Sequence, residues 1–298
     1  MNPLLNRLEV YPFERMNALK GDCVGNPAHQ HVALSIGEPK HPPPAFIVEA
    51  LCDPDALATD LATYPATRGS EALREAIAAW VSGRFQARLD PGTQVLPVAG
   101  TREALFSFAQ AVIGNKPDPI GMLPNPFYQI YEGAIYLAGA TPYFLNTTRE
   151  NDFLPDYASV PDAIWSRCEV LYLCSPGNPT GAGVDLETLT WLIEQADKFD
   201  FVIAADECYS EIYPDEQTPP IGLLQAAASM GRSGFERCVV FHSLSKRSNL
   251  PGLRSGFVAG DAEILKQYFQ YRTYEGCALP AQVQRCLLYT SPSPRDMI

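Results

Sequence analysis

A lysine that lies among serines follows an apolar run of the sequence. The stretch SLSKRSNLPGLR (243–254) comes directly after CVVFH (238–242). A lone lysine is ordinarily a solvated surface residue. Here hydroxyls and a guanidinium accompany it, and both groups suit a phosphate. The stretch therefore indicates that Lys246 can reach an aldehyde on a phosphorylated ligand. The side chains that can converge on the phosphate are Ser243, Ser245 and Arg254.

Two other loops carry polar groups just after apolar runs. Gly100 and Thr101 follow QVLPV (94–98) and open a helical pattern. Free N–H groups at a helix start form an anion site, although helix capping also explains these residues. After EVLYLC (169–174), prolines stiffen the loop around Asn178, so that its amide points into a site. A simple tight turn is the alternative for that loop.

A carboxylate ends a third apolar run, FVIAA (201–205). Asp206 follows it directly, and Tyr209 comes three residues later. A carboxylate at a buried strand end requires a cationic partner or several hydrogen-bond donors. Tyr209 could project its phenol toward the same space. The alternative is that Asp206 only caps a helix.

The apolar runs alternate with helical patterns from about residue 95 to residue 270. This alternation predicts an α/β fold with a mostly parallel sheet covered by helices on both faces. Ligands of such sheets bind beyond the carboxyl ends of the strands. The expected strands are 120–123, 141–146, 169–174, 201–205, 238–242 and 256–260, and the expected helices are 101–113, 127–139, 156–168 and 185–199, the last capped by Asp185.

The bulk composition excludes several classes of partner. The chain has 298 residues, with 34 acidic against 22 basic side chains and a net charge of −12. This balance argues against a nucleic acid or an anionic membrane as partner. No run approaches the ~20 apolar residues of a membrane span, and the N-terminus lacks the apolar segment of a secretory signal. The eight cysteines form no C-x-x-C pair and the four histidines show no metal-ligand spacing. We therefore expect reduced thiols, no metal site and a cytoplasmic location.

The motifs SPGNPTG, ADECY and SLSKRSNLPGLRSG, in this order, resemble the class I/II aminotransferases that depend on pyridoxal 5′-phosphate, of fold type I. The likeness extends from about Ser35 to Gln284. It implies an aminotransferase-type large domain, the cofactor pyridoxal 5′-phosphate, an amino acid and a 2-oxo acid as small-molecule partners, and a homodimer when full length. The segments SIGEPKHPPP, FHSLSKRSNLPGLRSGFVAGD and YRTYEGCALP resemble the branch of the family that acts in lysine biosynthesis.

The resemblance also implies roles for individual residues. Lys246 corresponds to the lysine that bonds to the cofactor and later moves the proton. Asp206 corresponds to the acid that pairs with the pyridine nitrogen, and Tyr209 and Asn178 to the donors to the phenolic oxygen. The residues implied at the phosphate are Gly100, Thr101, Arg102, Ser243, Ser245 and Arg254, with Tyr64 reaching a neighbouring subunit's phosphate. The remaining implied contacts are Tyr128 stacked on the ring, and Gly37 with Asn178 at the substrate.

The resemblance implies a division of the chain into an N-terminal arm with a small-domain remnant (1–36), a cofactor-binding domain (37–285) and a foreign tail (286–298). Family members extend further, so we expect most of the small domain, with its carboxylate-binding arginine, to be missing. The tail LLYTSPSPRDMI (287–298) is not expected to continue a helix. Ser255 stands where many relatives carry an apolar residue.

Several other functions are compatible with parts of this pattern. Other class I aminotransferases act on alanine, aspartate or aromatic substrates. The α-oxoamine synthases and carbon–sulfur lyases share the fold and the lysine, but their motifs match less well. A cofactor-binding regulatory module is opposed by the acidic balance and by the lack of a helix-turn-helix arm. An inactive cofactor-binding fragment is also compatible with the pattern.

Overall fold

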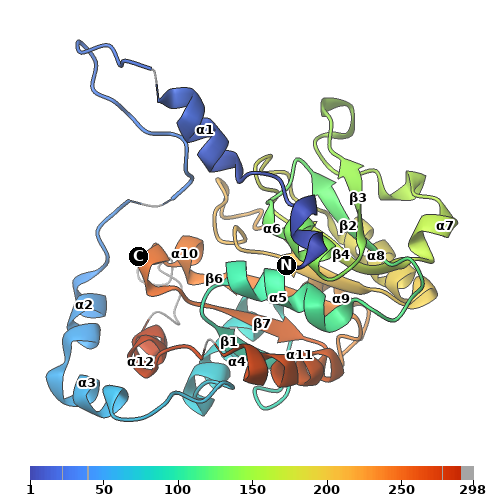
Figure 1. The fold of residues 1–298 in the computed structure, drawn as a ribbon. Coiled ribbons are helices and arrows are strands. Elements are labelled where there is room, and N and C mark those ends of the chain that lie inside the picture. The colour runs from blue at the N-terminus through green and yellow to red at the C-terminus, as the bar shows by residue number, and fades with distance from the viewer. Residues whose placement is uncertain (22, 39, 277, 290–298) are drawn as a thin grey trace.

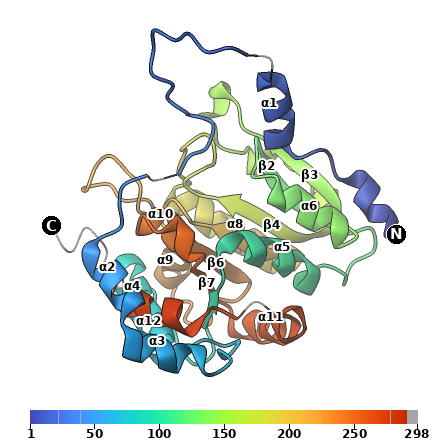
Figure 2. The same ribbon diagram turned by 60° about the vertical axis from the view of Figure 1, so that its left-hand side comes forward.

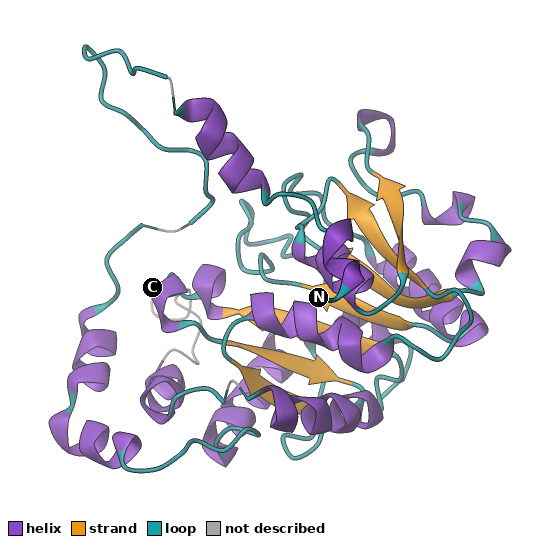
Figure 3. Ribbon diagram, in the orientation of Figure 1, coloured by secondary structure: helices purple, strands orange, loops and turns teal. Residues whose placement is uncertain are grey.

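A seven-stranded sheet forms the centre of this chain in the computed structural model, which describes residues 1–21, 23–38, 40–276 and 278–289 (Figures 1 and 3). The strand order is β1-β7-β6-β5-β4-β2-β3. Strand β7 runs antiparallel to both neighbours, and the other pairs are parallel. The strands are β1 Val95–Val98, β2 Ile120–Asn125, β3 Thr141–Asn146, β4 Cys168–Cys174, β5 Val202–Asp206, β6 Cys238–Ser243 and β7 Gly256–Gly260.

Helices cover both faces of the sheet because successive strand residues point to opposite sides. In β4, Val170 and Tyr172 are buried in one core cluster, whereas Leu171 and Leu173 are buried in the other. Both faces are therefore apolar, as a buried parallel sheet requires. One face packs on α5 Thr101–Val112, α6 Ile130–Leu137 and α11 Ala262–Glu275. The other packs on α4 Glu71–Phe85, α8 Leu186–Phe199, α9 Leu223–Ser229 and α12 Ala281–Tyr289.

These elements confirm the predicted α/β class and all six predicted strands. Three of the four predicted helices are also present, and the Asp185 carboxylate caps α8 by accepting a hydrogen bond from the Thr188 amide. The predicted helix over 156–168 is wrong. Only η3 (Tyr157–Ser159) and α7 (Asp162–Trp165) form there, because Pro161 lacks an N–H and cannot continue a helix.

The N-terminal segment stands apart from the sheet. Helix η1 (Pro3–Arg7) contacts α6, and α1 (Pro12–Lys20) buries none of its residues. Figure 1 shows α1 and the loop after it projecting from the body of the molecule. The chain then returns through α2 (Ala45–Cys52) and α3 (Pro54–Leu61).

Helix α12 packs against α2, α3 and α4, as the turned view shows (Figure 2). Cys286 and Leu287 are buried in these contacts. The expectation that the tail 287–298 does not continue a helix is therefore wrong for residues 287–289, which belong to α12, and residues 290–298 lie outside the described part. None of the helices in the described part of the chain is long and apolar enough to cross a membrane.

Candidate functional site

The loops singled out in the sequence meet at the carboxyl edge of the sheet. Asp206 is the last residue of β5, and the neighbouring β6 ends at Ser243, where α10 (Leu244–Arg247) begins. Strand β1 runs in the same direction, and Gly100 follows it as the N-cap of α5. This is the edge at which open α/β sheets bind ligands.

Asp206 is buried, with 5% of its surface exposed. Its Oδ1 accepts a hydrogen bond from the Cys208 amide at 3.2 Å, and its Oδ2 accepts one from the Tyr131 hydroxyl at 2.6 Å. Burial raises the pKa of the Asp206 carboxyl, and the hydrogen bonds from Cys208 and Tyr131 oppose that rise. The site thus holds a buried acid with two donors directed at it.

Lys246 lies on α10 and is half-buried. Its Nζ donates to the carbonyl oxygen of Gly37 and lies 5.7 Å from the centre of the Tyr209 ring. Burial lowers the pKa of the Lys246 amine, and the nearby Cys208 and Glu38 act in the opposite direction. The amine is therefore closer to its neutral, nucleophilic form than an ordinary lysine.

Tyr209 follows Asp206 in the turn after β5. Burial and the nearby Asp206 carboxylate raise the pKa of its phenol to about 12. The hydroxyl consequently keeps its proton at neutral pH and can donate a hydrogen bond.

Gly100 and Arg254 lie together at one corner of the site. Gly100 has a φ of 102°, and a Cβ added there would lie 2.6 Å from Nη2 of Arg254. Arg254 is itself held in the left-handed region, with a φ of 49°, and its Nη1 donates to the Pro251 carbonyl at 2.8 Å. Only a residue without a side chain lets this guanidinium lie against the start of α5, where the helix N–H groups also favour an anion.

The residues with predicted hydroxyl contacts lie at the same edge of the sheet, at the end of β6, in α10 and at the start of α5. Ser243 is buried, and its Oγ accepts a hydrogen bond from the Ser245 amide at 3.1 Å, which caps α10. That hydroxyl retains its own proton for donation. The Oγ1 of Thr101 lies 3.2 Å from the Sγ of Cys208, which joins the start of α5 to the turn after β5.

Tyr128 lies just before α6, half-buried, with its ring edge-on to that of Tyr131 at 5.8 Å. Burial raises the pKa of its phenol to about 12, and the charge of Arg102 acts against this rise. The exposed Arg102 guanidinium lies 5.4 Å from the ring centre of Tyr11. The structure thus places Arg102 beside the Tyr11 ring, and its contact with a phosphate stays a prediction.

Three predicted residues make fewer contacts with the other predicted site residues. Asn178 is half-buried and lines a small pocket with Cys174 beneath the loop after β4. Gly37 is exposed and meets the site through Lys246. Tyr64 is fully exposed in the loop after α3, so its role across a subunit interface stays a prediction.

Sequence reasoning missed Tyr131 and Cys208. Tyr131 follows Tyr128 by three residues, a spacing that places both on one side of a helix start. That spacing was the available signal. Nothing in the sequence identified Asp206 as the partner of Tyr131.

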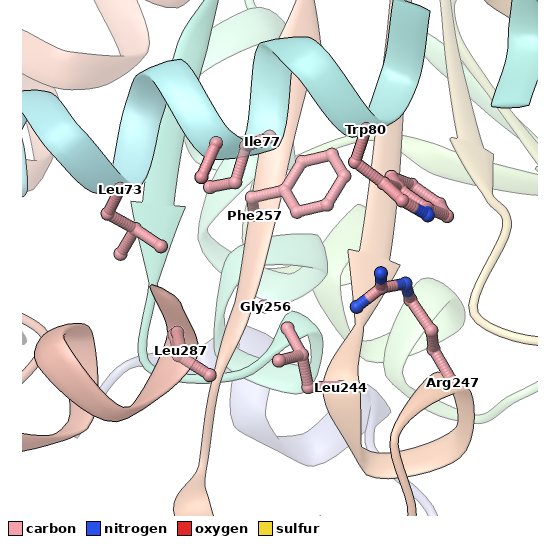
Figure 4. A pocket seen from close by; sticks show the side chains of 9 residues that line it. Leu73, Ile77, Trp80, Leu244, Arg247, Gly256, Phe257 and Leu287 are labelled. Atoms are coloured by element: carbon pink, nitrogen blue, oxygen red, sulfur yellow. The ribbon is translucent and has the colours of Figure 1, made fainter. Parts of the chain in front are cut away.

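A second pocket is lined in part by α10, and few of its lining side chains have groups that could take part in a reaction (Figure 4). Its wall is apolar apart from Arg247, whose guanidinium lies 4.5 Å from the centre of the Trp80 ring. It is not the predicted site, although Leu244 and Arg247 flank Lys246 on the same short helix. Its side chains come from α4, α10, β7 and α12: Leu73, Ala76, Ile77, Trp80, Leu244, Arg247, Gly256, Phe257 and Leu287.

Comparison with known proteins identifies the class that this fold and site define. The sequence profile of the family described as aminotransferase class I and II matches residues 29–288. The chain therefore belongs to the class I and II aminotransferase family, whose cofactor is pyridoxal 5′-phosphate.

Individual relatives agree with this class. A crystal structure of an aminotransferase from Neisseria meningitidis superposes with a TM-score of 0.91 at 45% identity, covering 99% of this chain and 74% of that one. The crystal structure of aminotransferase AspB from Helicobacter pylori superposes with a TM-score of 0.88 at 39% identity, covering 97% of this chain and 74% of that one.

Among curated proteins, the chain is similar to the LL-diaminopimelate aminotransferases of Dehalococcoides mccartyi and Aquifex aeolicus. The first is 32% identical over 90% of this chain, and the second is 34% identical over 78%. The matched segments span 66% and 58% of the length of these relatives.

The geometry fits the family's cofactor. A phosphate suits the corner where Gly100 admits the Arg254 guanidinium, and a pyridine nitrogen suits the buried acid Asp206. An aldehyde suits the half-buried amine of Lys246.

Proposed function

We propose that this chain provides the cofactor-binding part of an aminotransferase that moves an amino group between an amino acid and a 2-oxo acid. One observation carries the proposal. Three groups lie at the same edge of the sheet. They are a lysine whose pKa is lowered by burial, a buried carboxylate, and a guanidinium that lies against a glycine. Perturbed acids and bases gathered at a ligand-binding edge are typical of a catalytic site.

The cofactor supplies an electron-accepting ring that acidifies the Cα–H bond of an attached amino acid. The residues of this chain provide the binding and the proton transfers. The carboxylate of Asp206 favours a protonated ring nitrogen by charge pairing, and Tyr209 donates a hydrogen bond to the ring oxygen. Lys246, as a neutral amine, would accept the proton released from the Cα of the amino acid and, once protonated, could act as the acid that returns it. Arg254 and the start of α5 hold the phosphate.

For the substrates, we propose N-succinyl-2-amino-6-ketopimelate and glutamate, as in the succinyldiaminopimelate aminotransferases of lysine biosynthesis. The segments around 35–44, 241–261 and 271–280 support this choice. The names of the curated relatives support the diaminopimelate route and point to LL-diaminopimelate as the competing substrate. Competing functions are transamination of alanine, aspartate or aromatic substrates, and cofactor binding by an inactive fragment. A homodimer and a cytoplasmic location belong to the same proposal.

Cofactor attachment tests the first part of the proposal. The purified chain is titrated with pyridoxal 5′-phosphate, reduced with borohydride and mapped by peptide mass spectrometry. We expect the label on Lys246 and its loss in Lys246→Ala. Lys266→Ala, which removes an exposed amine on α11, serves as the matched control and should keep the label. A label spread over surface lysines would refute the assignment.

A panel of amino donors tests the substrates. The chain loaded with cofactor is mixed separately with glutamate, N-succinyl-LL-diaminopimelate, LL-diaminopimelate, aspartate and phenylalanine, and the cofactor's absorbance change is followed. Amino transfer from glutamate and the succinylated donor supports the proposal. Transfer from LL-diaminopimelate in place of the succinylated compound would favour the competing substrate. Cofactor binding without transfer from any donor would favour the inactive fragment.

A further inference from the structure

Tyr131 is a fully buried tyrosine directed at the predicted cofactor acid. It lies in the first turn of α6, and its hydroxyl donates to Oδ2 of Asp206 at 2.6 Å. An O–H···O distance in this range is typical of a hydrogen bond to a charged acceptor. The second donor to Asp206, the Cys208 amide, is longer at 3.2 Å and meets the other oxygen. Tyr131 therefore makes the shorter of these two contacts.

The sheet fixes both partners of this hydrogen bond. Ala204 of β5 is buried on the face that packs on α5 and α6, and Asp206, two residues later, points to the same face. Tyr172 of β4 lies on that face as well. The rings of Tyr131 and Tyr172 stack at 4.8 Å with planes 12° apart, which restricts the rotation of the Tyr131 ring.

Tyr172 is anchored in turn. Its hydroxyl donates to the carbonyl of Leu105 in α5 at 2.7 Å and not to the acid. The two stacked tyrosines thus have equal burial but different tasks, because Tyr131 bonds the carboxylate and Tyr172 bonds the backbone of a helix.

We propose that Tyr131 is a positioning residue, whose hydroxyl fixes the orientation of the Asp206 carboxylate and keeps it charged inside the site. This inference rests on the proposed function, since Asp206 needs its charge to pair with the cofactor's ring nitrogen. It assigns Tyr131 no contact with the substrate.

The surroundings of Asp206 explain why it needs such a donor. Burial disfavours the charged carboxylate, and hydrogen bonds from the Cys208 side chain and from the hydroxyl of Tyr131 counteract this by bonding the charged form. The pKa of Tyr131 is itself held well above the usual value by burial, so it remains a donor. The other titratable groups that face Asp206 come from β4, the turn after β5, β6 and the segment before α6: Cys174, Cys208, Tyr209, His242 and Tyr128.

Tyr131→Phe tests the proposal, with Tyr172→Phe as the matched control. Each removes one buried hydroxyl from the same ring stack. In the cofactor-free protein, infrared spectra of ¹³C-labelled aspartate report the protonation of Asp206, identified by its loss in Asp206→Asn. We expect Tyr131→Phe to raise the pKa of Asp206 and to weaken binding of pyridoxal 5′-phosphate about tenfold or more, whereas Tyr172→Phe changes the affinity by less than about threefold.

A double-mutant cycle separates positioning from packing. In the Asp206→Asn background, Tyr131→Phe should produce no further loss of cofactor affinity. Losses that add in the double variant would overturn the proposal, as would an unchanged Asp206 pKa in Tyr131→Phe.

If Tyr131→Phe does not fold, 3-fluorotyrosine at position 131 provides the second test. Its more acidic phenol is a stronger donor and should lower the pKa of Asp206. An unchanged or raised value would contradict the proposal. Because the infrared readout requires no cofactor, failure of the wild-type chain to bind pyridoxal 5′-phosphate would refute the proposed function and leave this test intact.

Discussion

A Cβ on Gly100 would lie 2.6 Å from the Nη2 atom of Arg254, which is well inside van der Waals contact. The guanidinium therefore occupies the space that any other residue at the N-cap of α5 would fill. This relationship joins the loop after β1 to the segment between β6 and β7. It makes the proposed phosphate corner depend on the absence of a side chain.

We expect Gly100→Ala to weaken binding of pyridoxal 5′-phosphate by more than about tenfold, because the displaced guanidinium would no longer make the hydrogen bonds to the phosphate that we propose for it. The positive φ of Gly100 adds a backbone strain of about 1 kcal/mol in the free energy of unfolding. Gly139→Ala is the matched control, since Gly139 also has a positive φ, 85°, but nothing within 4 Å of an added Cβ. Equal affinities for the two variants in a cofactor titration would contradict this account.

The lowered pKa of Lys246 predicts a pH dependence. Burial disfavours the charged amine, so it releases its proton at a lower pH than the ordinary value of 10.5. Cofactor capture should therefore rise with pH and level off below that value. Competitive labelling with acetic anhydride, read by mass spectrometry at a series of pH values, measures the midpoint for Lys246. The exposed Lys266 in the same sample calibrates the reagent.

Replacement of Glu38 tests whether a nearby negative charge raises the pKa of Lys246. Its negative charge supports the protonated form of Lys246, and it acts against burial. Glu38→Gln should consequently move the labelling midpoint of Lys246 to still lower pH. A midpoint at or above 10.5 is inconsistent with a desolvated amine, and an upward shift in Glu38→Gln is inconsistent with the charge effect assigned to Glu38.

Tyr209→Phe should reduce cofactor affinity roughly tenfold, the usual effect of one lost hydrogen bond to a charged acceptor. Since the pKa of Tyr209 is about 12, the phenol stays protonated between about pH 6 and pH 9, and the loss should not vary over that range. Equilibrium titration with pyridoxal 5′-phosphate measures it. Tyr274→Phe, at an exposed position of α11, should keep the wild-type affinity. An unchanged affinity in Tyr209→Phe would contradict the role of this hydroxyl as a donor, and a loss that fades between pH 6 and pH 9 would contradict the raised pKa of Tyr209.

The sequence predicted six of the seven strands because each of these six is a short apolar run that ends in, or is directly followed by, a polar residue. It also located Asp206 and Lys246, since both follow such runs closely. The contacts of these residues could not be predicted. The bond from Tyr131 to Asp206 and the approach of Arg254 to Gly100 join segments far apart in the chain, and only the folded sheet brings them together.

The error over residues 156–168 has a local cause. The apolar spacing there fits a helix, but Pro161 removes an N–H from its middle. The two short helical turns on either side keep Tyr157 and Trp165 buried, which is what the apolar spacing reflected.

The cap of α8 predicts a stability effect that does not involve the site. The Asp185 carboxylate accepts a hydrogen bond from the Thr188 amide at 2.8 Å, and hydrogen bonds from Thr188 lower its pKa. Asp185→Ala should reduce the free energy of unfolding in urea by about 1 kcal/mol at neutral pH, whereas Asp185→Asn, which keeps the acceptor, should change it by only a few tenths.

Because the pKa of Asp185 is lower in the folded state than its ordinary 3.8, the contribution of Asp185 to stability is complete well above that value and is lost as the pH falls through the folded-state pKa. The difference between wild type and Asp185→Ala should therefore shrink in acid, and a difference that grows as the pH is lowered would rule out the cap as its origin.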